Sequence, residues 1–588
     1  MRAHRLNLGH TLYWLAFLLA LFLRLFKLGA GPLSDAEANL ALQALGLTHG
    51  GGTSLGAQPA YLVLTSQLFS IFGDTNFLAR LYPALAGGLL VWLPFLLRRW
   101  TVTSPWLQRL GLVMAFGLAL DPGLVSLSRQ VGSPMPALAF SLLSLASFYN
   151  RRLVWTGIFA GLALLSGPAF PHGLLVLGIS LGFYRLLGQD DTPPVPGEDP
   201  AGLAAAPLTS KSISIILSAF AATLLVAGVL FLRLPEGVSV LAGTIPAYLD
   251  SWVKPSGIPL LRLPGSLLVY QPLALVFALV AMLRALFGHW DDPSLRRVLV
   301  GLGIWAGVAL LVPLLYAGRQ VGDLAWALVP LWALAAAEIS RALAFEQDRL
   351  THLVAAALGL LLFVLSVVGW FNLLSIGRYQ VNEVVYWAII IGALLLGFIA
   401  VLLVAATWSS AAAGLGVVWA VCVVLGLGLI SNTWGMSLVR QNSAQDLWSP
   451  PAATGQAGQL DVTLSDLSSW NTGLKDQLEI VSLVDSPALR WALRHYPNAR
   501  FEALLSPAVS PPVVITLKGS EPPLLAEKYR GQDFVWWLYP GWRGVFPPDI
   551  INWLAFHQAP LAQEQVILWA RADIFPGGAS GAAGDTAP

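Results

Sequence analysis

Long runs of apolar residues recur along about the first three quarters of the chain. A run of roughly 17–25 apolar residues is long enough to cross a bilayer as a helix, and the spacing of these runs predicts about 13 spans. The spans are expected near residues 11–28, 81–98, 108–127, 133–149, 154–169, 171–187, 212–232, 266–288, 297–316, 323–343, 351–372, 384–406 and 411–431. Gly167 and Pro168 interrupt one apolar stretch and divide it into the fifth and sixth spans.

Polar residues between the runs predict the orientation. With the N-terminus inside, about 14 basic residues fall on the inner side and about 9 on the outer side, in the sense of the positive-inside rule. An odd number of spans then exports residues 29–80 and everything after residue 431. The loop 188–211 is rich in Pro, Gly and Asp, which is typical of a flexible cytoplasmic linker.

Two amphipathic patterns occupy the first outward loop, at residues 36–48 and 59–72, and we expect helices lying along the membrane surface. After residue 431 the pattern changes to short apolar strands that alternate with helical periods. Strands are expected at 479–485, 511–517, 533–539 and 564–570, and helices at 487–496, 522–529 and 547–557. This alternation predicts an outward α/β domain over 432–575 and a disordered tail over 576–588, after a membrane domain over 1–431.

Composition agrees with a polytopic α-helical membrane protein. Of the 588 residues 56% are hydrophobic and 11% are charged, and the mean hydropathy is +0.70. A net charge of +2 gives no electrostatic reason to expect a nucleic-acid partner. Cys422 is the single cysteine, and no cluster of acids and histidines predicts a metal site, although a divalent ion is not excluded.

Acids stand beside the membrane in the stretch GPLSDAEANLALQAL, where Asp35 and Glu37 follow the first apolar run. A structural explanation is available for Asp35, because an Asp before a helix caps it by accepting backbone N–H bonds. The functional explanation is that the acids serve chemistry at the outer face, since charge close to the membrane is energetically expensive.

The order of motifs resembles a known family. GAQPAYLVLTSQLFSIFGDTNFLARLYPALAGGLL (56–90), SLSRQ (126–130) and GIFAGLALLSGPAF (157–170) follow the acidic loop, and YAGRQVGDLAWALVPLW (316–332) comes later. The chain thereby resembles the C-superfamily (GT-C) membrane glycosyltransferases, in the branch of protein O-mannosyltransferases and aminoarabinose transferases. The resemblance covers roughly residues 12–190 and implies transfer of a sugar from a polyprenyl-phosphate carrier.

The resemblance also implies roles for charged residues. A carboxylate takes the acceptor's proton and cations hold the leaving phosphate. Asp35 is the expected general base, and Glu37 orients the acceptor or takes over as base. Arg129, with Arg24, Arg80 or Arg319, is expected to hold the donor phosphate.

This chain departs from the family at the acids. The family usually has adjacent Asp-Glu before Ala, whereas here Ala36 precedes Glu37 and Asp35 is one residue early. A second acid that commonly follows the Ser-Arg motif is replaced by GSPMP. Each arginine also has a structural explanation, because a long basic side chain at the end of a span can extend to the lipid headgroups. Arg319 could instead form an ion pair with Asp323 at i, i+4 on a helix.

The predicted function is therefore transfer of a monosaccharide from a polyprenyl-phosphate donor to an acceptor at the outer face of the plasma membrane. The sugar is not specified, and the acceptor is a lipid, glycan or protein. The alternatives are an inactive membrane scaffold that binds lipid or glycan, and a transporter. Trp536, Trp537, Tyr539 and Trp542 are expected to be core or membrane-facing aromatics, with stacking on a sugar ring as the alternative.

Overall fold

The computed structural model describes residues 8–48, 57–97, 105–187, 209–229, 236–288, 290, 292–343, 348–379, 383–441, 443–449, 452–506, 509–519, 525 and 527–576. Helices make up the chain as far as residue 439, and a mixed sheet with further helices follows from residue 453. The predicted fold class, a polytopic helical membrane protein with a C-terminal α/β domain, is confirmed.

The first half of the helical part contains α1 (Leu8–Leu25), α2 (Asp35–Thr48), α3 (Pro59–Phe72), α4 (Asn76–Leu90), α5 (Leu93–Leu96), α6 (Pro105–Leu120), α7 (Pro122–Ser128), α8 (Pro134–Tyr149), α9 (Leu153–Leu164) and α10 (Ala169–Leu187). The second half contains α11 (Ser210–Thr223), α12 (Glu236–Val253), α13 (Arg262–Tyr270), α14 (Pro272–Leu286), α15 (Pro293–Leu315), α16 (Ala325–Leu343), α17 (Arg349–Tyr379), α18 (Glu383–Thr407) and α19 (Ser410–Trp434). Short η elements, η2 (Leu224–Gly228), η3 (Val321–Leu324) and η4 (Gly435–Val439), extend α11, precede α16 and extend α19.

Among the described residues, eight helices are long and apolar enough to cross a membrane, or up to ten if each of two bent pairs is one span. A helix covers most of every span expected from the sequence, but the count of about 13 is not confirmed and stays a prediction. The two amphipathic helices expected at 36–48 and 59–72 are α2 and α3.

Two of the expected spans are broken helices. Helix α6 meets α7 at 53° across Asp121, and α13 meets α14 at 96° across Gln271. Proline stands at the first position of both following helices, where its missing N–H removes no helical bond. Asp121 caps α7 by accepting a bond from the backbone N–H of Leu124 at 2.8 Å, and the Trp332 indole N–H donates to its other oxygen at 2.8 Å.

The C-terminal domain is built on a six-stranded sheet with the order β1-β5-β6-β4-β2-β3. Its strands are β1 (Ala453–Thr454), β2 (Ile480–Ser482), β3 (Ala499–Phe501), β4 (Val513–Leu517), β5 (Tyr529–Pro540) and β6 (Leu561–Arg571). The parallel pairs are β2–β3 and β2–β4, and the other neighbours are antiparallel. Helices α20 (Ala457–Thr472), α21 (Pro487–Ala492) and α22 (Ile550–Phe556) accompany it, followed by η5 (Ala572–Ile574).

All four strands and two of the three helices expected in this domain are present. The third expected helix, at 522–529, is wrong for those of its residues that the structure describes. Residues 521–524 and 526 lie outside the described residues, residues 525, 527 and 528 are not helical, and Tyr529 begins β5. Helix α20 and strands β1 and β3 were not predicted. Most of the linker 188–211 and of the tail 576–588 also lies outside the described residues, and the predicted domain boundaries stay predictions.

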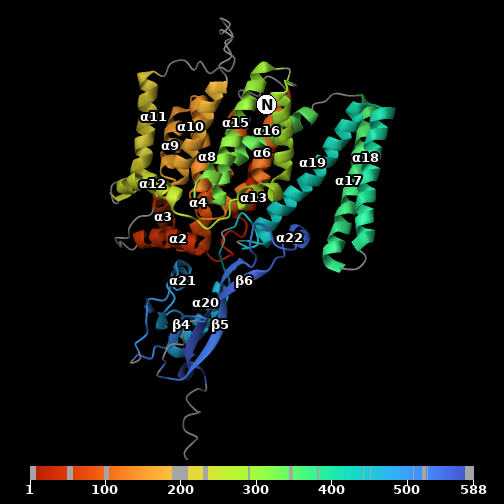
Figure 1. The fold of residues 1–588 in the computed structure, drawn as a ribbon. Coiled ribbons are helices and arrows are strands. Elements are labelled where there is room, and N and C mark those ends of the chain that lie inside the picture. Colours follow the sequence, from red (N-terminus) through yellow and green to blue (C-terminus); the bar gives the residue numbers. More distant parts are fainter. Residues whose placement is uncertain are drawn as a thin grey trace, which may run out of the picture.

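Figure 1 shows how these parts are arranged. Helices α2 and α3 lie across one end of the helical bundle, and the C-terminal sheet domain lies beyond the same end, with α21 against α2. The described N-terminal end of α1 lies at the opposite end. The beginning of α2, with its two acids, and the C-terminal domain therefore lie at the same end of the helical bundle, and the side of the membrane that this end faces stays a prediction.

Candidate functional site

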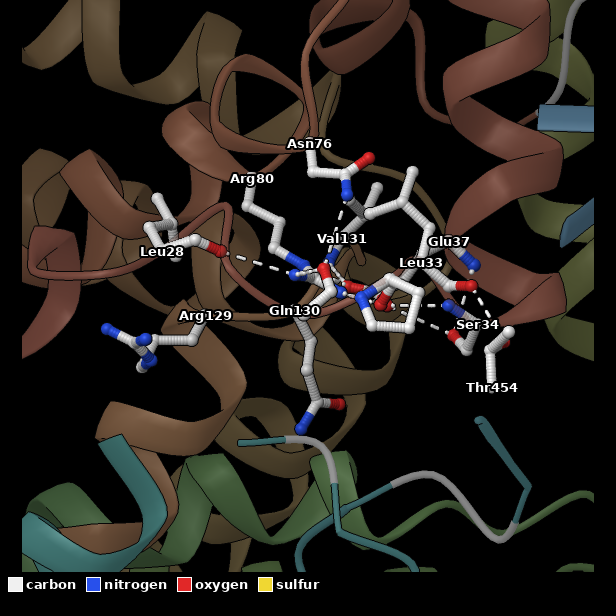
Figure 2. A network of polar contacts seen from close by, with 12 residues as sticks. Leu28, Leu33, Ser34, Glu37, Asn76, Arg80, Arg129, Gln130, Val131 and Thr454 are labelled. Atoms are coloured by element: carbon white, nitrogen blue, oxygen red, sulfur yellow. Dashed lines mark hydrogen bonds and ion pairs between the residues drawn. The ribbon is translucent and has the colours of Figure 1, made fainter. Parts of the chain in front are cut away.

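Glu37, in the first turn of α2, forms an ion pair with Arg80 of α4. The carboxylate of Glu37 accepts two bonds from the guanidinium of Arg80, Nε to Oε1 and Nη2 to Oε2, each 2.9 Å long (Figure 2). Both residues are only 2% exposed. Such a bidentate pair fixes the plane and the position of both groups, because the two bonds are parallel.

The other donors of Arg80 hold the loop between α1 and α2. Nη1 donates to the carbonyls of Leu28 at 3.2 Å and Gly31 at 2.9 Å, and Nη2 donates to that of Pro32 at 2.7 Å. All five N–H groups of Arg80 are therefore used, two on Glu37 and three on the loop. The sequence folds this way locally because Pro32 and the glycines before it keep the segment out of a helix and leave its carbonyls free.

Glu37 is equally well satisfied. The backbone N–H of Ser34 donates to Oε2 at 3.0 Å, its hydroxyl donates to the same oxygen at 3.2 Å, and the backbone N–H of Val131 donates to Oε1 at 3.1 Å. Burial alone would raise the pKa of Glu37, but the charge and hydrogen bonds of Arg80 and the two backbone N–H groups hold it below its ordinary value. Glu37 is consequently ionised over the physiological range.

A small hollow lies next to this ion pair. We call it the arginine hollow, and its lining residues are Leu28, Arg80, Ser126, Arg129, Met436, Gln441 and Ser449. Its lining residues thus include two arginines, two serines and a glutamine, and no Asp or Glu is among those described. Two cationic residues in the lining favour an anion over a cation at this place.

Arg129 is the cation of the hollow that has no acidic partner. It is 5% exposed, and its Nη1 donates to the carbonyls of Leu23, Arg24 and Phe26 at 2.9–3.1 Å. Its Nη2 donates to the carbonyl of Lys27 at 3.4 Å, and among the described residues no carboxylate forms an ion pair with Arg129. Within the part of the chain that the structure describes, the partners of this positive charge are therefore carbonyl groups, which carry partial negative charges.

The remaining predicted phosphate ligands lie away from the hollow's lining. Arg24 is fully buried in α1 and donates to the carbonyls of Leu118 and Ala119 and to the hydroxyl of Ser128 at 3.1–3.2 Å. Arg319 donates to the carbonyl of Ile258 at 3.4 Å. Of the four predicted arginines, the structure brings Arg80 and Arg129 to one hollow and does not bring Arg24 or Arg319 to its lining.

Asp35 faces the C-terminal domain. Its Oδ1 accepts bonds from the hydroxyl of Ser486 at 2.6 Å and the backbone N–H of Ala488 at 2.9 Å, and its Oδ2 accepts one from the Trp537 indole at 2.8 Å. Asp35 is the first residue of α2 rather than the cap before it, and the structure does not place it in the hollow's lining.

The aromatic residues of the C-terminal domain have mixed environments. Trp536 is fully buried in the domain core, and the indole of Trp537 bonds to Asp35 as described. In the part of the chain that the structure describes, no group of three or more His, Cys, Asp or Glu side chains is arranged to hold a metal ion.

Several lining residues of the hollow were not predicted. Ser126 belongs to the quoted SLSRQ motif, so its closeness to Arg129 was a signal within the sequence. Gln441 and Ser449 follow the last span, more than 300 residues away, and no local pattern connects them with Arg129.

Comparison with known proteins gives two solved structures to which the chain is similar. One is ArnT from Cupriavidus metallidurans bound to undecaprenyl phosphate, at 15% identity and a TM-score of 0.49, covering 94% of this chain and 97% of that one. The other is the same protein in the apo state, at 14% identity and a TM-score of 0.46, covering 96% and 98%. No family model and no curated protein matches the sequence. The two neighbours are aminoarabinose transferases with the GT-C fold, the group that the sequence motifs resemble.

Proposed function

We propose that this protein is a membrane glycosyltransferase that moves a monosaccharide from a polyprenyl-phosphate donor to an acceptor at the end of the bundle where α2 and the C-terminal domain lie. The observation that carries the proposal is the buried guanidinium of Arg129 in the arginine hollow, without a carboxylate partner among the described residues. A buried charge without a counter-ion is costly, and a phosphate dianion or monoanion would supply the missing charge.

The reaction is a displacement at the anomeric carbon. An acceptor oxygen forms a bond to that carbon while the bond to the phosphate oxygen breaks, and the lipid phosphate leaves with the bonding electrons. Negative charge grows on the leaving phosphate, where Arg129 and the hydroxyls of Ser126 and Ser449 would stabilise it. The acceptor's proton passes to a carboxylate.

Glu37 is our choice for that carboxylate, because it is joined to the hollow through Arg80, whereas Asp35 is held by the C-terminal domain. Its lowered pKa keeps it ionised but makes it a weak base. A weak base still serves here, because the acceptor hydroxyl becomes strongly acidic once its oxygen begins to bond to the anomeric carbon. The orientation predicted from the basic residues places this chemistry outside the cytoplasm.

One observation favours a second candidate. Both carboxylate oxygens of Glu37 already accept hydrogen bonds without substrate, Oε1 from Arg80 and Val131 and Oε2 from Arg80 and Ser34. A protein that binds the lipid phosphate without turnover needs the arginines but no free base, so a lipid-binding scaffold is also compatible with this geometry.

The test uses the full-length protein purified in detergent. Binding of undecaprenyl phosphate is compared with binding of the uncharged polyprenol, and Arg129→Gln is compared with Arg490→Gln, a surface arginine of α21 that is 44% exposed. We expect phosphate-dependent binding that falls at least tenfold in Arg129→Gln, the loss of roughly 1.4 kcal/mol, and is unchanged in Arg490→Gln. Equal binding of lipid phosphate and polyprenol would refute the proposed donor class.

Turnover separates the two candidates. Labelled polyprenyl-phosphate sugars are offered to the wild type, Glu37→Gln and Asp35→Asn, each checked for folding. Turnover that is lost in Glu37→Gln and kept in Asp35→Asn supports Glu37 as the base. Turnover that is lost in Asp35→Asn and kept in Glu37→Gln supports Asp35 as the base instead. Binding without turnover across a broad donor panel supports the lipid-binding scaffold.

A further inference from the structure

We propose that helix α21 of the C-terminal domain is a positioning element for the arginine hollow, because it holds the first turns of α2 and α4 in a fixed relation. The inference rests on the proposed function in one respect, namely that the hollow binds a phosphate. The contacts of α21 with α2 and α4 do not depend on that function. Asp35 is then a positioning residue that acts through Glu37.

The first half of the contact joins α21 to α2. Asp35 stands two residues before Glu37, and its Oδ1 accepts from both the Ser486 hydroxyl and the Ala488 backbone N–H, at the beginning of α21. Carboxylates are favoured at this end of a helix, where backbone N–H groups lack helical partners. Trp537 from β5 holds the second oxygen, so the carboxylate is fixed from two directions.

The second half joins the other end of α21 to α4. The indole of Trp491 donates to the side-chain oxygen of Asn76, the first residue of α4, at 2.8 Å. Arg494 donates to the Asp74 carboxylate at 2.6 Å and to the Asp74 carbonyl at 2.8 Å. The Arg494 guanidinium also lies 4.2 Å from the centre of the Trp491 ring, which orients both side chains.

These two contacts flank the ion pair of the hollow. Glu37 lies on α2 and Arg80 lies on α4, one helical turn after Asn76. The amide nitrogen of Asn76 donates to the Gly31 carbonyl, and Arg80 donates to the same carbonyl. A shift of α21 would therefore move both partners of the ion pair and the loop carbonyls between them.

The room for such a shift is small. A Cβ atom at Gly29 would lie 2.8 Å from the backbone nitrogen of Phe77, so the loop already touches the beginning of α4. Bidentate geometry between two guanidinium and carboxylate groups tolerates only small displacements. The C-terminal domain is thus placed to decide whether Arg80 faces the hollow in the geometry observed here.

The experiment compares Trp491→Phe, which keeps the ring but removes the indole N–H, and Arg494→Ala with the control Arg490→Ala. Arg490 is on the same helix, and its side chain contacts Asp485 and the Phe501 ring, neither of which is on α2 or α4. The first measurement is hydrogen exchange of the Ser34 and Val131 amides, which donate to Glu37. The second is the dissociation constant for undecaprenyl phosphate.

We expect exchange of these amides to rise about tenfold or more in Trp491→Phe and Arg494→Ala, the effect of a local loss of roughly 1.4 kcal/mol, and the dissociation constant to rise with it. Arg490→Ala should match the wild type in both, and Arg494→Lys should recover part of the loss because it keeps a charge beside Asp74. The melting temperature of each variant is measured as well. Trp491→Phe and Arg494→Lys, the conservative variants, should melt at the wild-type temperature, so that faster exchange in Trp491→Phe is not caused by general unfolding.

The outcomes separate this inference from the proposed function. Exchange in Trp491→Phe and Arg494→Ala that equals exchange in Arg490→Ala would overturn the positioning role, whatever the binding data show. Faster exchange with an unchanged dissociation constant would overturn the claim that the contact serves the hollow. If the wild type binds no lipid phosphate but exchange still rises, the contact stands and the proposed function fails.

Discussion

Removing Arg80 should destabilise the protein far more than removing a surface arginine. Arg80→Ala leaves the Glu37 carboxylate buried without a counter-ion and leaves the loop carbonyls of Leu28, Gly31 and Pro32 without their donors. Removing one partner of a buried ion pair typically costs about 3–5 kcal/mol. Since both partners are 2% exposed, solvent screening reduces this figure little.

Three further variants grade the effect. Glu37→Gln keeps an acceptor for Arg80 but removes the charge, so we expect a smaller loss of about 1.5–3 kcal/mol. Arg80→Lys should fall between them, because an ammonium has three N–H donors where the guanidinium has five. The control is Arg490→Ala, which breaks an exposed pair with Asp485 and should cost about 0–1 kcal/mol.

The pH dependence follows from the pKa of Glu37. Its pKa in the folded protein is lower than its ordinary value of about 4.3, so the stabilisation is complete above that ordinary value and is lost as the pH falls through the folded pKa. Denaturation in mixed micelles between pH 3 and pH 7 should show this acid-side loss in the wild type. The slope should be smaller in Glu37→Gln.

The result that would refute this reasoning is a loss in Arg80→Ala and Glu37→Gln no greater than in Arg490→Ala, with the same acid slope in all three. Glu37 would then be protonated or hydrated in the folded protein, and the bidentate pair would not be a stabilising element.

Two other predictions concern packing and topology. Gly173→Ala should destabilise by about 1–3 kcal/mol, because its Cβ would lie 1.9 Å from the Trp326 ring, whereas Gly178→Ala on the same helix meets nothing within 4 Å and should be neutral or stabilising by thermal melting. In a Cys422→Ala background, Val462→Cys, which is 61% exposed on α20, should react with a membrane-impermeant maleimide added outside intact cells; labelling from the cytoplasmic side alone would reverse the predicted orientation.

The sequence predicts the local elements of this fold well, because their signals are local. Apolar runs and prolines give the helices of the bundle, and the period of 36–48 and 59–72 gives α2 and α3 nearly to the residue. The missed elements are short or polar. Strand β1 has two residues and β3 has three, and α20 contains few apolar residues apart from its buried leucines, so neither length nor period marks them.

The site was predictable only in part. Charge beside a membrane is unusual enough to single out Glu37, Arg80 and Arg129, which the structure brings to the same small region. The partners of these residues could not be predicted, because Glu37 and Arg80 are 43 residues apart in the sequence and Asp35 and Ser486 are 451 apart. No periodicity reports such contacts. The sequence therefore offered Asp35 as a cap of its own helix or as a general base, whereas the folded chain uses it as a hydrogen-bond acceptor for another domain.

Two buried arginines, Arg24 of α1 and Arg129 at the end of α7, explain how the hollow keeps its positive charge. Arg24 donates to the carbonyls of Leu118 and Ala119 in the last turn of α6, and Arg129 donates to the carbonyls of Leu23 and Arg24 in the last turn of α1. Arg24 thus satisfies free carbonyls at the end of α6, and Arg129 satisfies free carbonyls at the end of α1. The C-terminal end of a helix carries a partial negative charge of roughly half an elementary charge, which favours a cation there.

This exchange fixes Arg129 beside the hollow without neutralising it. Helix carbonyls carry partial charges, so the guanidinium keeps a net positive charge after they are satisfied, whereas Arg80 is neutralised by Glu37. Among the described residues, the hollow therefore has one arginine that is paired with a carboxylate and one whose partners are carbonyl groups. That division makes Arg129, rather than Arg80 or Arg24, the residue whose loss should remove binding of a phosphate. The same loss removes the donors of the carbonyls of Leu23, Arg24 and Phe26, so folding of the variant is checked beside binding.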